Sequence, residues 1–117
     1  MTPFGAKLRR LRAERNLQLK AMAAALGVSA AYLSALEHGH RGRPSSGLVQ
    51  QISAYFNLAW DDVDELKRLA ELSHPRVVVD TAGLSPRATE LANRLAEVIG
   101  ELDDAAIERV LKELGER

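Results

Sequence analysis

The side chains of this 117-residue sequence that could do chemistry are mainly its lysines and arginines, and they are unevenly distributed. The whole chain holds 16 basic and 16 acidic residues and has no net charge. Residues 1–60 nevertheless hold eight basic and two acidic residues, a net charge of +6, whereas residues 61–117 carry −6. Such asymmetry indicates a half that faces nucleic acid and a half with another role. The eight basic residues are Lys7, Arg9, Arg10, Arg12, Arg15, Lys20, Arg41 and Arg43.

Other reactive groups form no recognisable constellation. The sequence has no glycine-rich phosphate loop, no metal-ligand spacing and no nucleophile elbow. Glu37, His38 and His40 lie close together in sequence, but they lack a plausible fourth ligand or geometry for a metal ion. The absence of cysteine excludes a disulfide framework and a thiolate metal site. We therefore expect no enzymatic activity, no metal and no cofactor.

The elements that must position the basic residues are two short helices around a bend. Residues 19–26 have apolar side chains at helical spacing on one face. Gly27 then ends this helix, because glycine adopts the left-handed conformation without a Cβ clash. Ser29 is a preferred N-cap for a second helix, which Gly39 ends. Two helices joined by a short turn containing glycine are typical of the helix-turn-helix, whose second helix can enter the major groove of DNA.

Specific residues in and after this stretch match a known pattern. They are Met22-Ala23, Gly27-Val28-Ser29, Leu33-Ser34, Leu36-Glu37 and Gly39, followed by the run H-R-G-R-P through Pro44. With them the chain resembles the Cro/cI-type helix-turn-helix family of phage repressors and bacterial XRE regulators, over about residues 4 to 72. The resemblance implies an all-α fold with a five-helix domain. It also implies a sequence-specific regulator, a dimeric repressor that binds double-stranded DNA at a pseudo-palindromic operator.

The resemblance further implies which residues contact DNA. Base edges would be read from the first exposed positions of helix 29–38, where alanine can contact only a thymine methyl and Ser34 can hydrogen-bond to more than one base. Readout would then be permissive and would depend on DNA shape, unless the alanines are small only to let the helix pack. Family members usually carry a phosphate-contacting Gln where Leu19 stands, so that contact is in doubt. The expected DNA-binding residues are Lys20, Ser29, Ala30, Ala31, Tyr32, Ser34, Ala35, His38, His40, Arg41 and Arg43.

One structural ion pair is also implied by the resemblance. In the family, an arginine at the position of Arg12 pairs with a glutamate at the position of Glu37. The planar guanidinium suits this role because it can hold a carboxylate in two places. The pair would tie the first helix to the recognition helix. The alternative is that both side chains are separate surface charges.

The remaining helices of the first domain follow from capping and periodicity. Thr2-Pro3 predicts a helix start, with Phe4, Leu8 and Leu11 on its core face. Ser45 or Ser46 caps a helix that buries its apolar face, and a last helix runs from about Trp60 to Ser73. We predict a domain over residues 1–74. The expected core positions of the last two helices are Leu48 or Val49, Ile52, Tyr55, Phe56, Val63, Leu66, Leu69 and Ala70.

Residues 75–117 are predicted to be a linker and a helical dimerisation region. Residues 76–80 contain three consecutive valines, which favour an extended segment. This segment either pairs with its copy in a second subunit or lies across the helical domain. Beyond it, two helices carry an apolar stripe, heptad-like in its first part, that packs against a second copy or folds back on its own domain. The residues of this tail seam are Leu84, Leu91, Leu95, Val98, Leu102, Ile107, Val110, Leu111 and Leu114.

Two functional hypotheses remain open at this point. The first is a dimeric DNA-binding repressor, and a close variant is an antitoxin whose acidic tail binds a toxin. The second is a protein-interaction adaptor that keeps the fold without the DNA contacts, which the blunt alanine surface favours. The chain beyond the five helices is too short for a separate sensor domain, so a small-molecule effector is not expected. No signal peptide or membrane helix is apparent, which favours a cytoplasmic protein.

Overall fold

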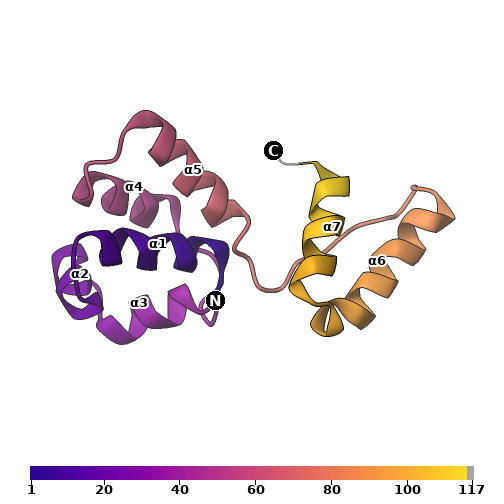
Figure 1. Ribbon diagram of the computed structural model, residues 1–117, viewed down its shortest axis with the longest axis horizontal. Coiled ribbons are helices and arrows are strands. Elements are labelled where there is room, and N and C mark those ends of the chain that lie inside the picture. Colours follow the sequence, from indigo (N-terminus) through magenta and orange to yellow (C-terminus); the bar gives the residue numbers. More distant parts are fainter. Residues whose placement is uncertain (116–117) are drawn as a thin grey trace. The chain divides into compact units, whose positions relative to one another are not determined.

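The computed structural model describes residues 1–115 and is helical, with no strand in that range (Figure 1). The predicted all-α class is therefore confirmed. The chain divides into two compact units, Met1–Val77 and Val78–Arg117. The sequence placed the boundary between residues 74 and 75, and the structure places it between Val77 and Val78.

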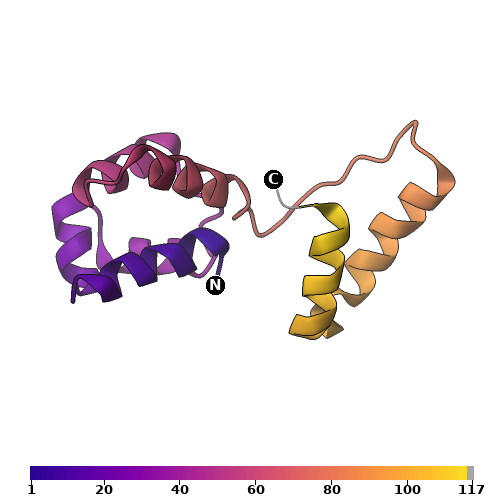
Figure 2. The same ribbon diagram turned by 45° about the horizontal axis from the view of Figure 1, so that its top comes forward.

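The first unit consists of five helices: α1 (Pro3–Glu14), α2 (Leu19–Leu26), α3 (Ala30–Glu37), α4 (Ser46–Tyr55) and α5 (Trp60–Glu71). Helix α1 packs against α3 and α5, while α2 packs on α3 and α4 on α5. Figures 1 and 2 show these helices enclosing a common interior. The core is aliphatic with two phenylalanines, and its buried apolar residues are Phe4, Leu8, Leu11, Met22, Ala23, Leu26, Leu33, Leu36, Leu48, Val49, Ile52, Phe56, Leu66 and Ala70.

Hydroxyl side chains fix three of the helix starts. The side chains of Thr2, Ser29 and Ser45 accept hydrogen bonds from backbone N–H groups in the first turns of α1, α3 and α4. These bonds satisfy donors that have no partner inside the helix. The entry to α1 has a further tie, because Ser73, just beyond α5, accepts a hydrogen bond of 2.9 Å from the backbone N–H of Phe4.

Three details of the first unit differ from the sequence predictions. Tyr55 was expected in the core but is 41% exposed, because it is the last residue of α4 and the adjacent Phe56 takes the buried place. The two rings meet edge to face. Helix α5 ends at Glu71 rather than at Ser73. The side chains of Val63 and Leu69 are half-buried rather than fully buried.

The second unit contains α6 (Pro86–Val98), the 3₁₀ turn η1 (Ile99–Glu101) and α7 (Asp104–Leu114). The side chains of Ser85 and Asp103 cap α6 and α7 as they do at helix starts in the first unit. The two helices diverge from η1, as Figure 2 shows within this unit. Unlike the first unit, the described residues of the second include no buried side chain.

Residues 76–80 form no strand within the described chain. They have no regular secondary structure, and the three valine side chains are exposed by 64–93%. A single strand cannot form a ladder without a partner, and the described chain contains no other strand. No single helix in residues 1–115 is long and apolar enough to cross a membrane. The bent pair α2–α3 has the length and composition of a membrane span when its two helices are taken together.

Candidate nucleic-acid interface

A left-handed glycine and a serine N-cap form the bend between α2 and α3, as the sequence predicts. Gly27 adopts φ 74°, and its backbone N–H and that of Val28 bond to carbonyls of the last turn of α2. The hydroxyl of Ser29 then accepts a bond of 3.0 Å from the backbone N–H of Tyr32. Together they turn the chain by 108° between the two helices, within the range of about 90–120° typical of a helix-turn-helix.

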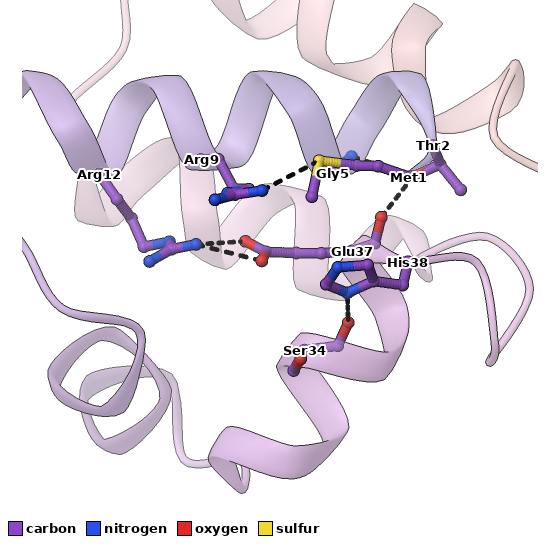
Figure 3. Close-up of polar contacts among 8 residues, drawn as sticks. All are labelled: Met1, Thr2, Gly5, Arg9, Arg12, Ser34, Glu37 and His38. Atoms are coloured by element: carbon purple, nitrogen blue, oxygen red, sulfur yellow. Dashed lines mark hydrogen bonds and ion pairs between the residues drawn. The ribbon is translucent and has the colours of Figure 1, made fainter.

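Helix α3 is held from its inner side by apolar contacts and one ion pair. Leu33 and Leu36 are fully buried, and Glu37 beside them is 1% exposed. The Nη2 atom of Arg12 lies 3.1 and 3.0 Å from the two carboxylate oxygens of Glu37. Figure 3 shows this guanidinium reaching from α1 to the end of α3. A buried carboxylate needs such a partner, because an unpaired buried charge is strongly unfavourable.

The same end of α3 is tied to the start of α1 through its backbone. The backbone N–H of Thr2 donates to the carbonyl oxygen of Glu37 at 3.0 Å. Gly5 lies against this carbonyl so closely that a Cβ on it would be 2.1 Å from the oxygen. Only glycine allows this approach of the two helices. Sequence reasoning missed Gly5, and the available signal was a glycine between the core residues Phe4 and Leu8.

The outer side of α3 presents small side chains at the predicted base-reading positions. Ser29 and Ala31 are exposed. Ala30 and Tyr32 are half-buried and pack in part against the core. The other two positions, Ser34 and Ala35, are also half-buried. This outer side therefore carries methyl and hydroxyl groups and no long side chain apart from Tyr32.

The loop after α3 carries exposed cationic side chains. Arg41 and Arg43 make no ion pair or hydrogen bond within residues 1–115, and the same is true of Lys20 on α2. The Nδ1 atom of His38 lies 2.8 Å from the carbonyl oxygen of Ser34, which holds its ring against the last turn of α3 (Figure 3). The ring of His40 stacks near it, with centroids 6.3 Å apart.

A groove lies beside this loop. Its volume is about 500 Å³, and its lining includes Arg43, Ser45 and Ser46 at the start of α4 and Lys67 on α5. Two cationic side chains and the N-terminus of α4 thus border one concave surface. Positive side chains and unpaired N–H groups of a helix start both favour anionic groups such as phosphates. The carboxylate of Glu71 also lines the groove, so its lining is of mixed charge.

Comparison with known proteins agrees with this geometry. A family model described as a helix-turn-helix domain matches residues 3–66, more than half of the chain. The chain belongs to the helix-turn-helix domain family. The match ends within α5, so it covers most of the first unit and none of the second.

Two proteins of Bacillus subtilis (strain 168) resemble this helix-turn-helix domain. One is the uncharacterized HTH-type transcriptional regulator RghRB, 33% identical over 63 residues, which are 54% of this chain and 45% of that protein. The other is the HTH-type transcriptional repressor RghR, 36% identical over 61 residues, which are 52% of this chain and 45% of that protein. The matched part of this chain therefore spans less than half the length of either relative. No solved structure matches.

A second residue of the helix-turn-helix domain that sequence reasoning missed is Arg15. Its guanidinium donates a hydrogen bond of 3.1 Å to the carbonyl oxygen of Phe56 and lies 4.8 Å from the centroid of the Phe56 ring. This contact closes the C-terminal end of α4 against α1. A basic residue just beyond a helix, with no acidic partner in sequence, gives no signal of such a role. The guanidinium of Arg15 therefore makes a structural contact within the domain, whereas those of Arg41 and Arg43 make none within residues 1–115.

Outside the helix-turn-helix domain, the nine residues of the tail seam remain accessible. Seven of them are exposed by 36% or more, and Leu102 and Ile107 are half-buried. Full burial of a leucine or valine side chain stabilises a protein by about 1.5–3 kcal/mol, and this stabilisation is absent while the side chain stays in water. Contiguous exposed apolar side chains of this kind are typical of surfaces that bind another protein.

Proposed function

We propose that this chain is a sequence-specific regulator of transcription, of repressor type, that binds double-stranded DNA with α3 in the major groove. The observation that carries the proposal is the open outer side of α3, followed directly by the unpaired side chains of Arg41 and Arg43. A helix fixed from behind and free in front can enter a groove about 12 Å wide. The two arginines, on the loop directly after α3, would then contact phosphates at the edge of that groove.

Affinity in this proposal comes from phosphates and selectivity from small groups. Lys20, Arg41 and Arg43 neutralise phosphate charge, which binds DNA of any sequence and weakens with salt. Ala31 and the less exposed Ala30 and Ala35 contact thymine methyl groups, while the hydroxyl of Ser34 bonds to a base edge. His38, His40 and Tyr32 flank these contacts, and Ser29 presents the start of α3 to the backbone.

A dimer completes the proposal. Helix-turn-helix domains of this kind read two half-sites about 34 Å apart, so the operator is a pseudo-palindrome. The exposed tail seam supplies an association surface that does not use the DNA-facing side of the first unit. The relatives named as a transcriptional regulator and a transcriptional repressor support the regulatory role. This function is one of binding and requires no catalysis.

The proposal is tested by a salt titration of binding to random-sequence DNA. We expect log Kd to rise linearly with log salt, and the double change Arg41→Ala with Arg43→Ala to reduce this slope by about two. The control changes Arg87 and Arg94, two exposed arginines of α6 that pair with Glu90. An unchanged slope in the α3-loop variant, or an equal loss in the control, would show that the loop does not contact phosphates.

A second candidate is a protein-interaction adaptor on the same fold. It is favoured by the absence of amide or other long polar side chains among residues 29–35, apart from the Tyr32 phenol. The same titration separates the two candidates, because an adaptor would bind no DNA even at low salt. Selection of bound fragments from random DNA would then give the half-site spacing of a regulator.

A further inference from the structure

The segment Arg76-Val77-Val78-Val79-Asp80 contains three consecutive valines with little packing around them. The three valine side chains are exposed by 72%, 93% and 64%. Their backbone N–H and C=O groups make no hydrogen bond within residues 1–115. β-Branched residues favour extended backbone. An extended segment with unpaired donors and acceptors is a template for pairing with another strand.

The charges at the two ends of this segment select the partner. If the segment pairs antiparallel with a second copy of itself, centred on Val78, Arg76 lies opposite Asp80 of the second copy at both ends. Val77 then lies opposite Val79, and Val78 opposite Val78. A parallel arrangement would instead place like charges together, which is destabilising. Shifting the antiparallel register by one residue would lose both charge pairs.

The hydrogen bonds already present agree with one phase of this pairing. The backbone N–H of Arg76 donates to Nδ1 of His74 at 3.2 Å, so it is not free for a partner strand. If Val78 occupies a non-hydrogen-bonded position, the ladder uses only the N–H and C=O groups of Val77 and Val79. The N–H of Arg76 then points away from the partner strand, which is compatible with its bond to His74.

The segment is also bounded on its C-terminal side. The Oδ1 atom of Asp80 accepts a hydrogen bond of 2.9 Å from the backbone N–H of Ala82. The backbone N–H of Leu84 bonds to the carbonyl oxygen of Thr81. These turns redirect the chain directly after Asp80, so a ladder would not extend toward α6. The second carboxylate oxygen of Asp80 has no partner in the described chain and is open to a guanidinium.

We propose that residues 76–80 form an intermolecular antiparallel ribbon with a second copy of this chain, centred on Val78 and closed at each end by an Arg76–Asp80 pair. The proposal rests on the dimer of the proposed function and deepens it. A two-stranded ribbon of this length is marginal alone, so it forms only where the tail seam brings two copies together. It then fixes the two linkers at one point, which limits how far apart the two helix-turn-helix domains can lie.

The test uses single cysteines, because the chain contains none. In the proposed register the two Val78 residues form a non-hydrogen-bonded pair with Cα atoms about 4.5 Å apart, a separation that a disulfide can span. We expect full-length Val78→Cys to form a disulfide-linked dimer at least tenfold faster than Val77→Cys. The Val77 side chains of the two copies are diagonal neighbours about 7–8 Å apart. Ala82→Cys, beyond the ribbon, is a second matched control.

The outcomes separate the ribbon from the dimer. Each variant is first sedimented under reducing conditions. A dimer in which Val78→Cys crosslinks no faster than the two controls overturns the ribbon and leaves the dimer standing. A monomer at every concentration overturns both. Preferential crosslinking through Val78→Cys in a dimer supports both.

A charge exchange gives an independent test of register. Arg76→Asp alone places two aspartates opposite each other at both ends, and Asp80→Arg alone does the same with arginines. We expect each to weaken self-association by about tenfold, and their mixture to form heterodimers, in which every pair is opposite in charge. The change Arg87→Asp outside the segment is the control. Random mixing of the two variants would overturn the ribbon.

Discussion

The two units of this chain follow the same local rules and reach opposite results in packing. Helices α3 and α4 in the first unit and α6 in the second begin at a serine whose hydroxyl accepts a backbone N–H, and all have apolar side chains at helical spacing. The first unit buries fourteen apolar residues in one cluster, whereas the described part of the second buries none. Capping and periodicity therefore specify a helix, but they do not specify what its apolar face will contact.

This difference has a physical consequence for stability. The first unit is stabilised by its own core, so its free energy of unfolding does not depend on protein concentration. The second unit has an exposed seam, so in the proposed dimer the stability of α6 and α7 would depend on association. Changes in the first unit should act at every concentration. Changes in the tail seam should act chiefly on a monomer–dimer equilibrium.

The largest expected effect comes from breaking the ion pair between α1 and α3. Arg12→Ala would leave the carboxylate of Glu37, 1% exposed, without its cation. Removing one partner of a buried pair costs about 3–5 kcal/mol. We expect the free energy of unfolding of the first unit to fall by about this amount, as measured by urea denaturation.

A double variant provides the control for this prediction. Changing both Arg12 and Glu37 to Met removes the charges together and fills a similar volume, and we expect it to be closer to wild type than Arg12→Ala. Equal losses in the single and double variants would show that packing, not the uncompensated charge, carries the effect.

The next effect compares a core leucine with a seam leucine. Leu66 on α5 is fully buried, and Leu66→Ala should cost about 3 kcal/mol at any protein concentration. Leu91 on α6 is 64% exposed. We expect Leu91→Ala to leave the unfolding of the first unit unchanged and to weaken dimerisation. Urea denaturation at two protein concentrations measures the unfolding of the first unit, and sedimentation measures dimerisation. A large loss of first-unit stability in Leu91→Ala would contradict the comparison.

The sequence was a good guide wherever the structure is decided locally. The left-handed Gly27, the cap at Ser29 and the starts of α4 and α6 depend on residue type and on the next few positions. The core positions of α1 also followed from spacing, because one face of a helix must be covered. The Arg12–Glu37 contact was expected only from the family resemblance, since the two residues lie 25 positions apart.

Contacts between distant segments could not be predicted in the same way. Tyr55 and Phe56 are equally apolar by pattern, and only the end of α4 decides which of the two is buried. Gly5 allows the backbones of α1 and α3 to approach closely, and Ser73 accepts a hydrogen bond from a residue 69 positions earlier in the chain. Neither contact leaves a periodic signal in the sequence. The valines of residues 76–80 indicated a strand, but a strand requires a partner that the described chain does not contain.

A smaller effect tests the close approach of α1 and α3 in the first unit. Gly5→Ala would normally favour a helix by about 1 kcal/mol. Here its Cβ would meet the carbonyl oxygen of Glu37 at 2.1 Å, and the helices would have to separate. We expect a net loss of about 2 kcal/mol, seen as a lower Tm. Gly47→Ala on α4 is the matched control, since its Cβ would meet nothing, and it should not lower Tm.

The smallest expected effect addresses the comparison most directly, because it makes the same change in both units. Ser29→Ala and Ser85→Ala each remove an N-cap hydrogen bond, of 3.0 and 3.2 Å, and each should cost about 1 kcal/mol. In the first unit this loss lowers the free energy of global unfolding, because α3 unfolds only with the core. In the second unit we expect roughly fivefold faster amide hydrogen exchange confined to α6. Ser46→Ala, which removes no cap, is the control in both measurements. A global effect of Ser85→Ala would mean that the tail is not an independent unit, since a loss of helix in α6 can reach the core only through contacts between the two.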